Sequence, residues 1–459
     1  MNPKKPNSAV SRRNFFKKSM VASAGMIAAA SVPEVALAYD RESAAPVKIW
    51  ITDVRCAIIK DQPVVRITTN AGISGYGMAE SYKPYLKPMV AFYKDYIMGL
   101  DPTDVTYALN KIRRMGSFKP WGAAVSAIEM ALWDIAGKAA GVPVYKLLGG
   151  KIRDKVRIYS GGGKPPMSRL DPEEYASVAQ WVKDSKEGYT MAKFAMAYHT
   201  GMPTTIPDFY YGFPNSTTGP NPMSGAPAGP TKRTSHPYRG PLTDKGFKHI
   251  IACVEAIKKV LGDDVGVALD MGPGHTISDS IKLAKAMEPY NLLWLEDLIT
   301  GDYTPYVMAD MYRDLTMSTT TPIHTGEQIY LRQHFKELFE KQAVRVVGPD
   351  PADVGGIAEM KWIAEYGELH GVSMAPHGVF DGLLGLAAHV HCAAAMPENY
   401  IAFEYPVAAP EWYDMVEGLP DPIVKKGLIE VWDRPGMGVE IKTAVAKKYL
   451  SAEDKNFFD

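Results

Sequence analysis

The sequence predicts an α/β protein in which a closed parallel barrel is joined to a smaller α+β domain. Between residues 270 and 377, short apolar runs rich in Val, Leu, Ile or Met each end in an acidic residue or a histidine. The gaps between these runs are long enough for a helix, as in consecutive βα units. The chain has 459 residues, which leaves room for a second domain beside a barrel of roughly 250 residues.

The composition, with 46% apolar and 22% charged residues, is typical of an ordinary soluble, enzyme-like protein. The whole chain has no net charge, and without residues 1–38 it carries 45 basic and 50 acidic side chains. This balance gives no indication of a nucleic-acid or anionic-membrane partner. Cys56, Cys253 and Cys392 lie far apart in the chain, which favours buried free thiols over a disulfide or zinc framework.

Residues 1–38 are predicted to be a twin-arginine export signal. Arg12 and Arg13 precede a weakly apolar run from Met20 to about Val32, and Ala36-Leu37-Ala38 is typical of a cleavage site. A run of about 13 residues is too short for a membrane anchor, which needs about 20. We therefore expect cleavage after Ala38, no membrane attachment of the mature chain, and a periplasmic or otherwise exported protein.

Residues 47–155 are predicted to form the α+β domain, with segment 406–459 packing back on it. Val47–Asp53 and Val64–Thr69 are typical of strands. Two glycine-containing segments, Asn70-Ala-Gly72 and Gly75-Tyr-Gly77, are predicted to supply the turns of a hairpin.

Residues 120–149 are predicted to be largely helical. Ala124, Ile128 and Ile135 are among the apolar residues that recur there at helical spacing. The glycines from Gly137 to Gly141 mark the end of the helix.

The barrel is predicted to span residues 156–405. Eight apolar runs are the expected strands: Val156–Ser160, Tyr189–Met196, Val265–Met271, Leu292–Asp297, Thr321–Glu327, Val344–Asp350, Val372–Gly378 and Tyr400–Tyr405. Amphipathic connectors such as Ser278–Met287 and Gly355–His370 fit between most of them. The exception is the stretch 197–245, rich in Pro, Gly, Ser and Thr, which predicts a long functional loop that covers substrate or contacts another subunit. Solvated disorder is the alternative for this loop.

Three carboxylates on successive predicted strands indicate a metal site. Asp270, Glu296 and Glu327 are separated by about one βα unit each. Carboxylates that converge in one barrel mouth repel one another unless a cation neutralises them. Ligands that are all oxygen favour Mg²⁺, with Mn²⁺ next.

Asp350 and His377 are predicted to form a catalytic pair. They end neighbouring strands, so their side chains can lie side by side. An aspartate beside a histidine fixes its tautomer and stabilises the imidazolium, which makes a competent general base.

These residues resemble the mandelate racemase subgroup of the enolase superfamily over essentially the whole mature chain. Residues 123–150 resemble the helical segment of its capping domain, and the barrel segments that match in order are Leu269-Asp270, Trp294–Asp297, Gly326-Glu327, Pro349-Asp350 with Gly355-Gly356, Pro376-His377 and Phe403-Glu404.

The resemblance implies a modified TIM barrel, (β/α)₇β, with an N-terminal α+β cap and a Mg²⁺ ion held by the three carboxylates. It also implies that Lys193 faces the carboxylate of a small-molecule substrate and that Glu404 hydrogen-bonds to that substrate. The family is often oligomeric, so a homo-oligomer is expected.

One departure from the family pattern favours a particular reaction. The second strand often carries Lys-x-Lys in the family, but it reads Lys193-Phe194-Ala195 here. In this respect the chain is more similar to the acid-sugar dehydratases, rhamnonate dehydratase in particular, than to mandelate racemase. Racemisation needs a second acid–base group, and Ala195 cannot supply one. We therefore expect loss of the β-hydroxyl from a sugar acid to give a 2-keto-3-deoxy acid.

Two loop residues, Tyr198 and His199, are expected to contact the substrate. The acid that assists departure of the hydroxyl is left open between His377 and these two residues. Three other functions also remain open. They are a racemase or epimerase, a cycloisomerase, and an exported protein that binds without catalysis.

Overall fold

The computed structural model describes residues 48–80, 85–116, 119–211, 241–299, 307–378 and 380–459. The predicted export signal and residues 212–240 of the predicted loop lie outside the described residues. No helix in the described part of the chain is long and apolar enough to cross a membrane.

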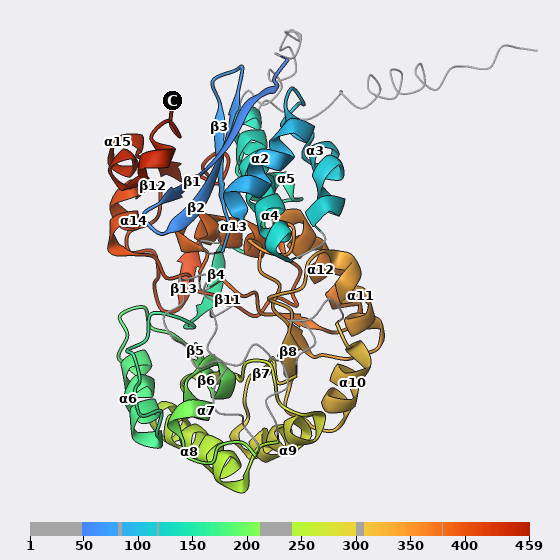
Figure 1. Cartoon of the computed structure of the whole chain (residues 1–459), viewed down its shortest axis with the longest axis vertical. Helices are drawn as coiled ribbons and strands as arrows, with labels where there is room; N and C mark the ends of the chain where they lie inside the picture. The colour runs from blue at the N-terminus through green and yellow to red at the C-terminus, as the bar shows by residue number, and fades with distance from the viewer. Residues whose placement is uncertain (1–47, 81–84, 117–118, 212–240, 300–306, 379) are drawn as a thin grey trace, which may run out of the picture. The chain divides into compact units, whose positions relative to one another are not determined.

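An antiparallel sheet in the order β1–β2–β3 begins the described chain. Its strands are β1 Ile51–Ile59, β2 Gln62–Thr69 and β3 Ser74–Met78. Helices α2 Leu86–Ile97 and α4 Lys119–Ala140 pack on the sheet, and α3 Val105–Ile112 and α5 Val144–Leu147 complete the group (Figure 1). We call residues 49–150 the cap.

The prediction that Gly75-Tyr-Gly77 forms a turn is wrong, because these residues lie inside β3. A Cβ added to Gly75 or Gly77 would lie 2.1 Å or 1.9 Å from a backbone oxygen of α4. The two glycines therefore allow the sheet to approach the helix closely. The first strand also begins at Ile51 instead of residue 47.

Within the described residues, eight parallel strands close into a barrel, as predicted. They are β4 Lys155–Tyr159, β5 Met191–Ala195, β6 Gly266–Asp270, β7 Leu295–Glu296, β8 Ile323–Thr325, β9 Val346–Val347, β10 Ser373–Met374 and β11 Phe403–Glu404. Strands β5 to β10 form one sheet and β11 pairs with β4. Single bridges, Ser160 to Ala192 and Met374 to Tyr400, join the two groups.

Several barrel strands are shorter than the predicted apolar runs. The parallel pairing nevertheless continues past their ends through single hydrogen bonds, such as the one from the Asp297 N–H to the His324 carbonyl, 3.1 Å long. The apolar runs therefore mark the barrel wall, and the regular ladder covers only part of each run.

Helices surround the strands and follow them in sequence. They are α6 Pro172–Lys183, α7 Met202–Thr205, α8 Asp244–Leu261, α9 Ile277–Met287, α10 Ala309–Met317, α11 Arg332–Glu340, α12 Ile357–Leu369 and α13 Gly382–Ala395. Figure 1 shows α8 to α11 along the outside of β5 to β8. Every residue of α13 is buried.

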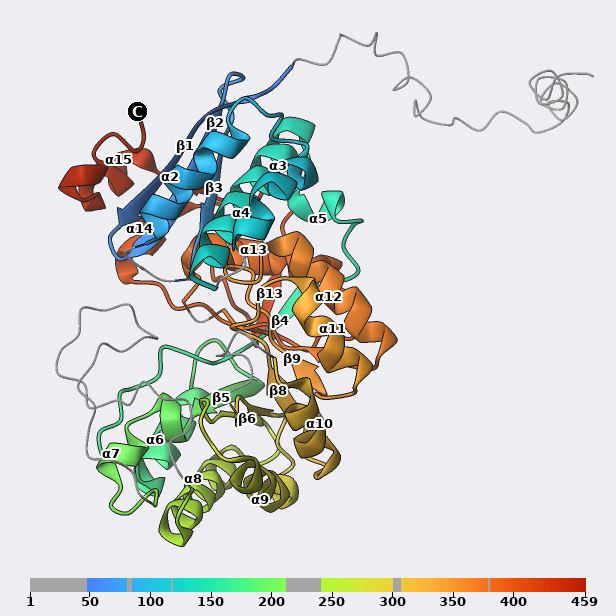
Figure 2. The ribbon, with the colours of Figure 1, turned by 45° about the vertical axis from the view of Figure 1, so that its right-hand side comes forward.

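The C-terminal segment returns to the cap. Its elements are α14 Pro410–Met415, β12 Val416–Glu417, β13 Leu428–Glu430, β14 Glu440–Ile441 and α15 Thr443–Ala446, and Figure 2 shows α14 and α15 beside β1. The carboxylate of Asp454 accepts the Ile58 N–H at 3.0 Å and pairs with Lys87 at 2.6 Å. These contacts hold the end of the chain against the cap sheet.

A side chain of the cap completes a helix of the barrel. Glu129, on α4, accepts the N–H groups of Ile357 and Ala358 in the first turn of α12, at 2.8 Å and 2.9 Å. The indole N–H of Trp133 also donates to Glu129, at 2.7 Å. These first-turn N–H groups have no partner within their own helix. Glu129 of the cap therefore serves as the N-terminal hydrogen-bond acceptor of α12, the helix that follows β9.

The free energy of unfolding is expected to fall in acid because of the buried side chain of His391. It lies on α13 and donates from Nε2 to the Met437 carbonyl at 2.9 Å, and burial lowers its pKa to about 4. The unfolded chain protonates this histidine first as pH falls, so stability drops from about pH 6.5 down to about pH 4, by up to about 3 kcal/mol. A His391→Gln variant keeps a side-chain N–H donor without titrating. Its free energy of unfolding, measured in urea across this range, should fall less steeply than that of the wild type. An equal slope would contradict the prediction.

Candidate active site

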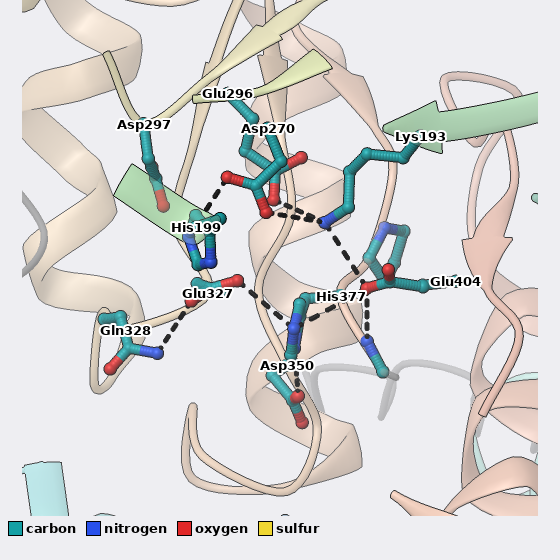
Figure 3. A network of polar contacts seen from close by, with 12 residues as sticks. Lys193, His199, Asp270, Glu296, Asp297, Glu327, Gln328, Asp350, His377 and Glu404 are labelled. Carbon is teal, nitrogen blue, oxygen red and sulfur yellow. Dashed lines mark hydrogen bonds and ion pairs between the residues drawn. The ribbon is translucent and has the colours of Figure 1, made fainter. Parts of the chain in front are cut away.

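The barrel strands bring the predicted polar residues to one mouth. Asp270 at the end of β6 is in register with Glu296 at the end of β7, and Glu404 ends β11. Figure 3 shows these side chains converging with Lys193, Glu327 and His377. Each is at most 6% exposed, so their charges act on one another with little screening by water.

Lys193 lies at the centre of these carboxylates. Its Nζ is 2.6 Å from Glu296 Oε1, 3.4 Å from Glu404 Oε2 and 3.6 Å from Asp270 Oδ2. Burial lowers the pKa of this lysine, but the charges of Glu296 and Glu404 have the larger combined effect. The net result is a pKa well above the usual value. Lys193 is therefore a fixed cation in the mouth of the barrel.

Asp350 and His377 form the predicted side-chain pair. His377 Nδ1 lies 2.6 Å from Asp350 Oδ2, and Nε2 lies 3.2 Å from Glu327 Oε2 and 3.6 Å from Glu404 Oε2. Burial lowers the pKa of His377, while Glu327, Glu404 and Asp350 together raise it well above its usual value. With Nδ1 held by Asp350, Nε2 is the ring atom that faces the mouth.

His199 reaches the same mouth from the loop after β5. It belongs to a short 3-10 helix, Ala197–His199, and its Nε2 lies 3.1 Å from Asp270 Oδ1. Burial lowers the pKa of His199, which favours a neutral ring. The side chain of Tyr198 lies outside the described part of the structure.

Asp297 is an acidic residue at the site that the sequence reasoning did not assign. Its backbone has φ 51°, a left-handed conformation that aspartate tolerates better than most residues. This turn interrupts the alternation of a strand, so consecutive residues Glu296 and Asp297 both face the mouth. In the described residues, Glu296, Asp297 and Glu327 offer ligand atoms within 4.8 Å of one another.

The residues present fit a divalent cation. The donors are all carboxylate oxygens, which Mg²⁺ and Mn²⁺ prefer. Burial raises the pKa of Asp270 to about 6, and the neighbouring charge of Glu327 adds to this effect. Such crowding of buried carboxylates is relieved by a bound cation. Glu296 and Glu327 belong both to the predicted ligand set and to the group of three carboxylates within 4.8 Å of one another. The third ligand is Asp270 in the predicted set and Asp297 in that group.

His324 and Lys164 are two further polar residues that the sequence reasoning missed. His324 Nδ1 is 3.3 Å from Glu296 Oε2, and its ring stacks on Trp294. The alternation in Ile323-His-Thr325 is the signal that places His324 on the inner face of the barrel. Lys164 follows β4 and donates to the Ser160 carbonyl at 3.0 Å. Burial lowers its pKa to about 7.

Comparison with known families matches most of the chain. Residues 180–445 match the sequence model described as enolase C-terminal domain-like. Residues 33–149 match the mandelate racemase / muconate lactonizing enzyme N-terminal domain.

Individual relatives include several sugar-acid dehydratases. D-xylonate dehydratase of Haloferax volcanii is 30% identical over 419 residues, covering 89% of this chain and 90% of the relative. D-galactonate dehydratase of Ralstonia pickettii is 28% identical, covering 83% of this chain and 89% of the relative. A mandelate racemase/muconate lactonizing enzyme-like protein from Rubrobacter xylanophilus superposes with a TM-score of 0.72 at 31% identity, over 88% of this chain and 97% of the other.

Proposed function

We propose that this protein, which belongs to the mandelate racemase subgroup of the enolase superfamily, is a divalent-metal-dependent sugar-acid dehydratase. The reaction removes water from a 2,3-dihydroxy carboxylate and yields a 2-keto-3-deoxy acid. The observation that carries the proposal is the convergence of a paired histidine, a fixed lysine and several carboxylates in one barrel mouth. The names of the relatives, which are dehydratases of D-xylonate and D-galactonate, support the substrate class.

His377 is assigned the removal of the α-proton. Its Nε2 faces the mouth, and Asp350 on Nδ1 stabilises the imidazolium that forms when the proton arrives. Electrons of the broken C–H bond pass to the substrate carboxylate and produce an enediolate. Lys193 lies where a cation offsets this charge. A bound divalent cation would supply further stabilisation of the same charge.

Elimination is favoured over epimerisation because β5 carries no second base. Ala195, in register with Asp270, offers a methyl group where a second base would return the proton. The β-hydroxyl leaves with a proton as water, and the enol takes up a proton at C3 as it becomes the keto acid. His199 is the residue that keeps an epimerase as the second candidate, since its ring is in the mouth beside Asp270.

Turnover in D₂O separates the two reactions. We expect a panel of aldonic, aldaric and uronic acids, starting with D-xylonate and D-galactonate, to contain a substrate that gives a 2-keto acid with deuterium at C3. NMR of the product measures this directly. Accumulation of the deuterated α-epimer without any keto acid would replace the dehydratase with an epimerase.

The twin-arginine pattern of residues 1–38 supports a further part of the proposal, that this enzyme acts outside the cytoplasm.

A further inference from the structure

Beneath the carboxylates of the mouth lies the large aromatic side chain of Trp294. Its carbonyl accepts the Leu269 N–H at 3.1 Å, so the pairing of β6 with β7 extends back to this residue. Residues two apart on a strand point to the same face, which places Trp294 one layer deeper in the barrel than Glu296. The side chain is 0% exposed. It shares an apolar cluster with three small residues of neighbouring strands, Ala268, Ala375 and Ala402.

The indole N–H of Trp294 donates to the Glu296 carboxylate. Its Nε1 lies 2.9 Å from Glu296 Oε2, and both side chains are buried. The other oxygen of Glu296, Oε1, is 2.6 Å from Lys193 Nζ. Hydrogen bonds to an ionised acceptor are about twice as strong as those between neutral groups. The Glu296 carboxylate is therefore held at both oxygens, by Lys193 in the mouth and by Trp294 from the layer below.

Two neighbouring rings hold the plane of the indole. His324 stacks on Trp294 with ring centroids 5.3 Å apart and planes 23° apart, and Tyr159 meets it edge to face at 5.3 Å and 76°. Gly348 leaves room for His324, because an added Cβ would lie 2.5 Å from its Nε2. His324 Nδ1 is 3.3 Å from Glu296 Oε2 but makes no hydrogen bond among the described residues. The donor to this oxygen is thus the indole.

We propose that Trp294 is a positioning residue for the metal: its indole N–H fixes the Glu296 carboxylate in the orientation that binds a divalent cation. A ring that only filled the barrel would need no N–H directed at a carboxylate. Loss of a hydrogen-bond partner of a metal ligand typically costs about 10- to 100-fold in metal affinity. The inference rests on the proposed function in so far as Glu296 is a ligand of the metal.

Trp294→Phe tests the proposal, because phenylalanine keeps an apolar aromatic ring and lacks the N–H. Calorimetric titration of the folded variant should give an affinity for Mg²⁺ about 10- to 100-fold below that of the wild type. Trp133→Phe is the matched control. Trp133 also donates its indole N–H to a buried glutamate, Glu129, at 2.7 Å, but this pair belongs to the cap. The control should bind Mg²⁺ with wild-type affinity.

A tryptophan analogue separates the hydrogen bond from the packing. Benzothienylalanine at position 294 keeps the bicyclic shape and has sulfur in place of the N–H, so it should lower the affinity for Mg²⁺ by the same factor. This measurement decides the matter even if Trp294→Phe does not fold. With a sugar acid that is turned over, saturating Mg²⁺ should restore the kcat of Trp294→Phe, which a purely structural defect would not allow.

The titrations need no substrate, so they stand if no sugar acid is turned over, a result that would overturn only the assigned reaction. A wild-type protein that binds neither Mg²⁺ nor Mn²⁺ would overturn the metal-dependent function and this inference together. Wild-type affinity in Trp294→Phe or in the sulfur analogue would overturn the role of Trp294 alone. An equal loss in Trp133→Phe would do the same, because it would assign the effect to general stability.

Discussion

Replacing His377 with asparagine is expected to abolish turnover and α-proton exchange together. Asparagine can still contact Asp350, but it has no basic atom where Nε2 now lies 3.2 Å from Glu327. General-base catalysis contributes about 10²- to 10⁴-fold, so kcat should fall by at least that range. The measurements are keto-acid formation and loss of the α-proton signal in D₂O.

A His199→Asn variant is the matched control, because it changes a second imidazole in the same mouth. If His199 serves as the acid for the departing hydroxyl, this variant should slow keto-acid formation while α-proton exchange continues. Continued exchange in the His377→Asn variant would show that another group removes the proton.

Glu296→Gln is expected to weaken metal binding strongly. Glu296 belongs both to the predicted ligand set and to the group of three carboxylates within 4.8 Å of one another. Its loss should lower the affinity for Mg²⁺ or Mn²⁺ more than loss of a residue that only hydrogen-bonds to a metal ligand, which costs about 10- to 100-fold. Turnover should fall with it. Calorimetric titration with each metal measures the affinity, and circular dichroism checks the fold.

The fold should survive because Lys193 keeps its contacts with Asp270 and Glu404. Glu359→Gln is the control, since Glu359 is equally buried in the barrel but is bound by Arg332 at 2.6 Å. Normal metal affinity in the Glu296→Gln protein would remove this residue from the ligand set. Comparison of Asp270→Asn with Asp297→Asn identifies the third ligand.

The barrel could be predicted from the sequence because its strands appear as apolar runs at regular spacing. Apolar runs that recur after one βα unit specify eight parallel strands, and a polar residue at the end of each run must reach the mouth. Asp350 and His377 lie 2.6 Å apart for this reason. The strand ends were predicted less well, since hydrogen bonding between neighbours decides where a ladder stops.

Other features depend on contacts between segments that are distant in sequence. Gly75 and Gly77 look like turn residues until α4 is packed against them. Asp297 faces the mouth only because its backbone is left-handed.

The contacts of Glu129 with α12 make the barrel dependent on the cap. A barrel expressed without the cap would lose the acceptor for two amides of α12, at the helix that follows the strand of Asp350. Those amides would exchange their Glu129 acceptor for water, and an intramolecular hydrogen bond of this kind contributes about 0.5–1.5 kcal/mol. The catalytic barrel is thus an incomplete folding unit, and full-length protein should unfold in a single cooperative transition.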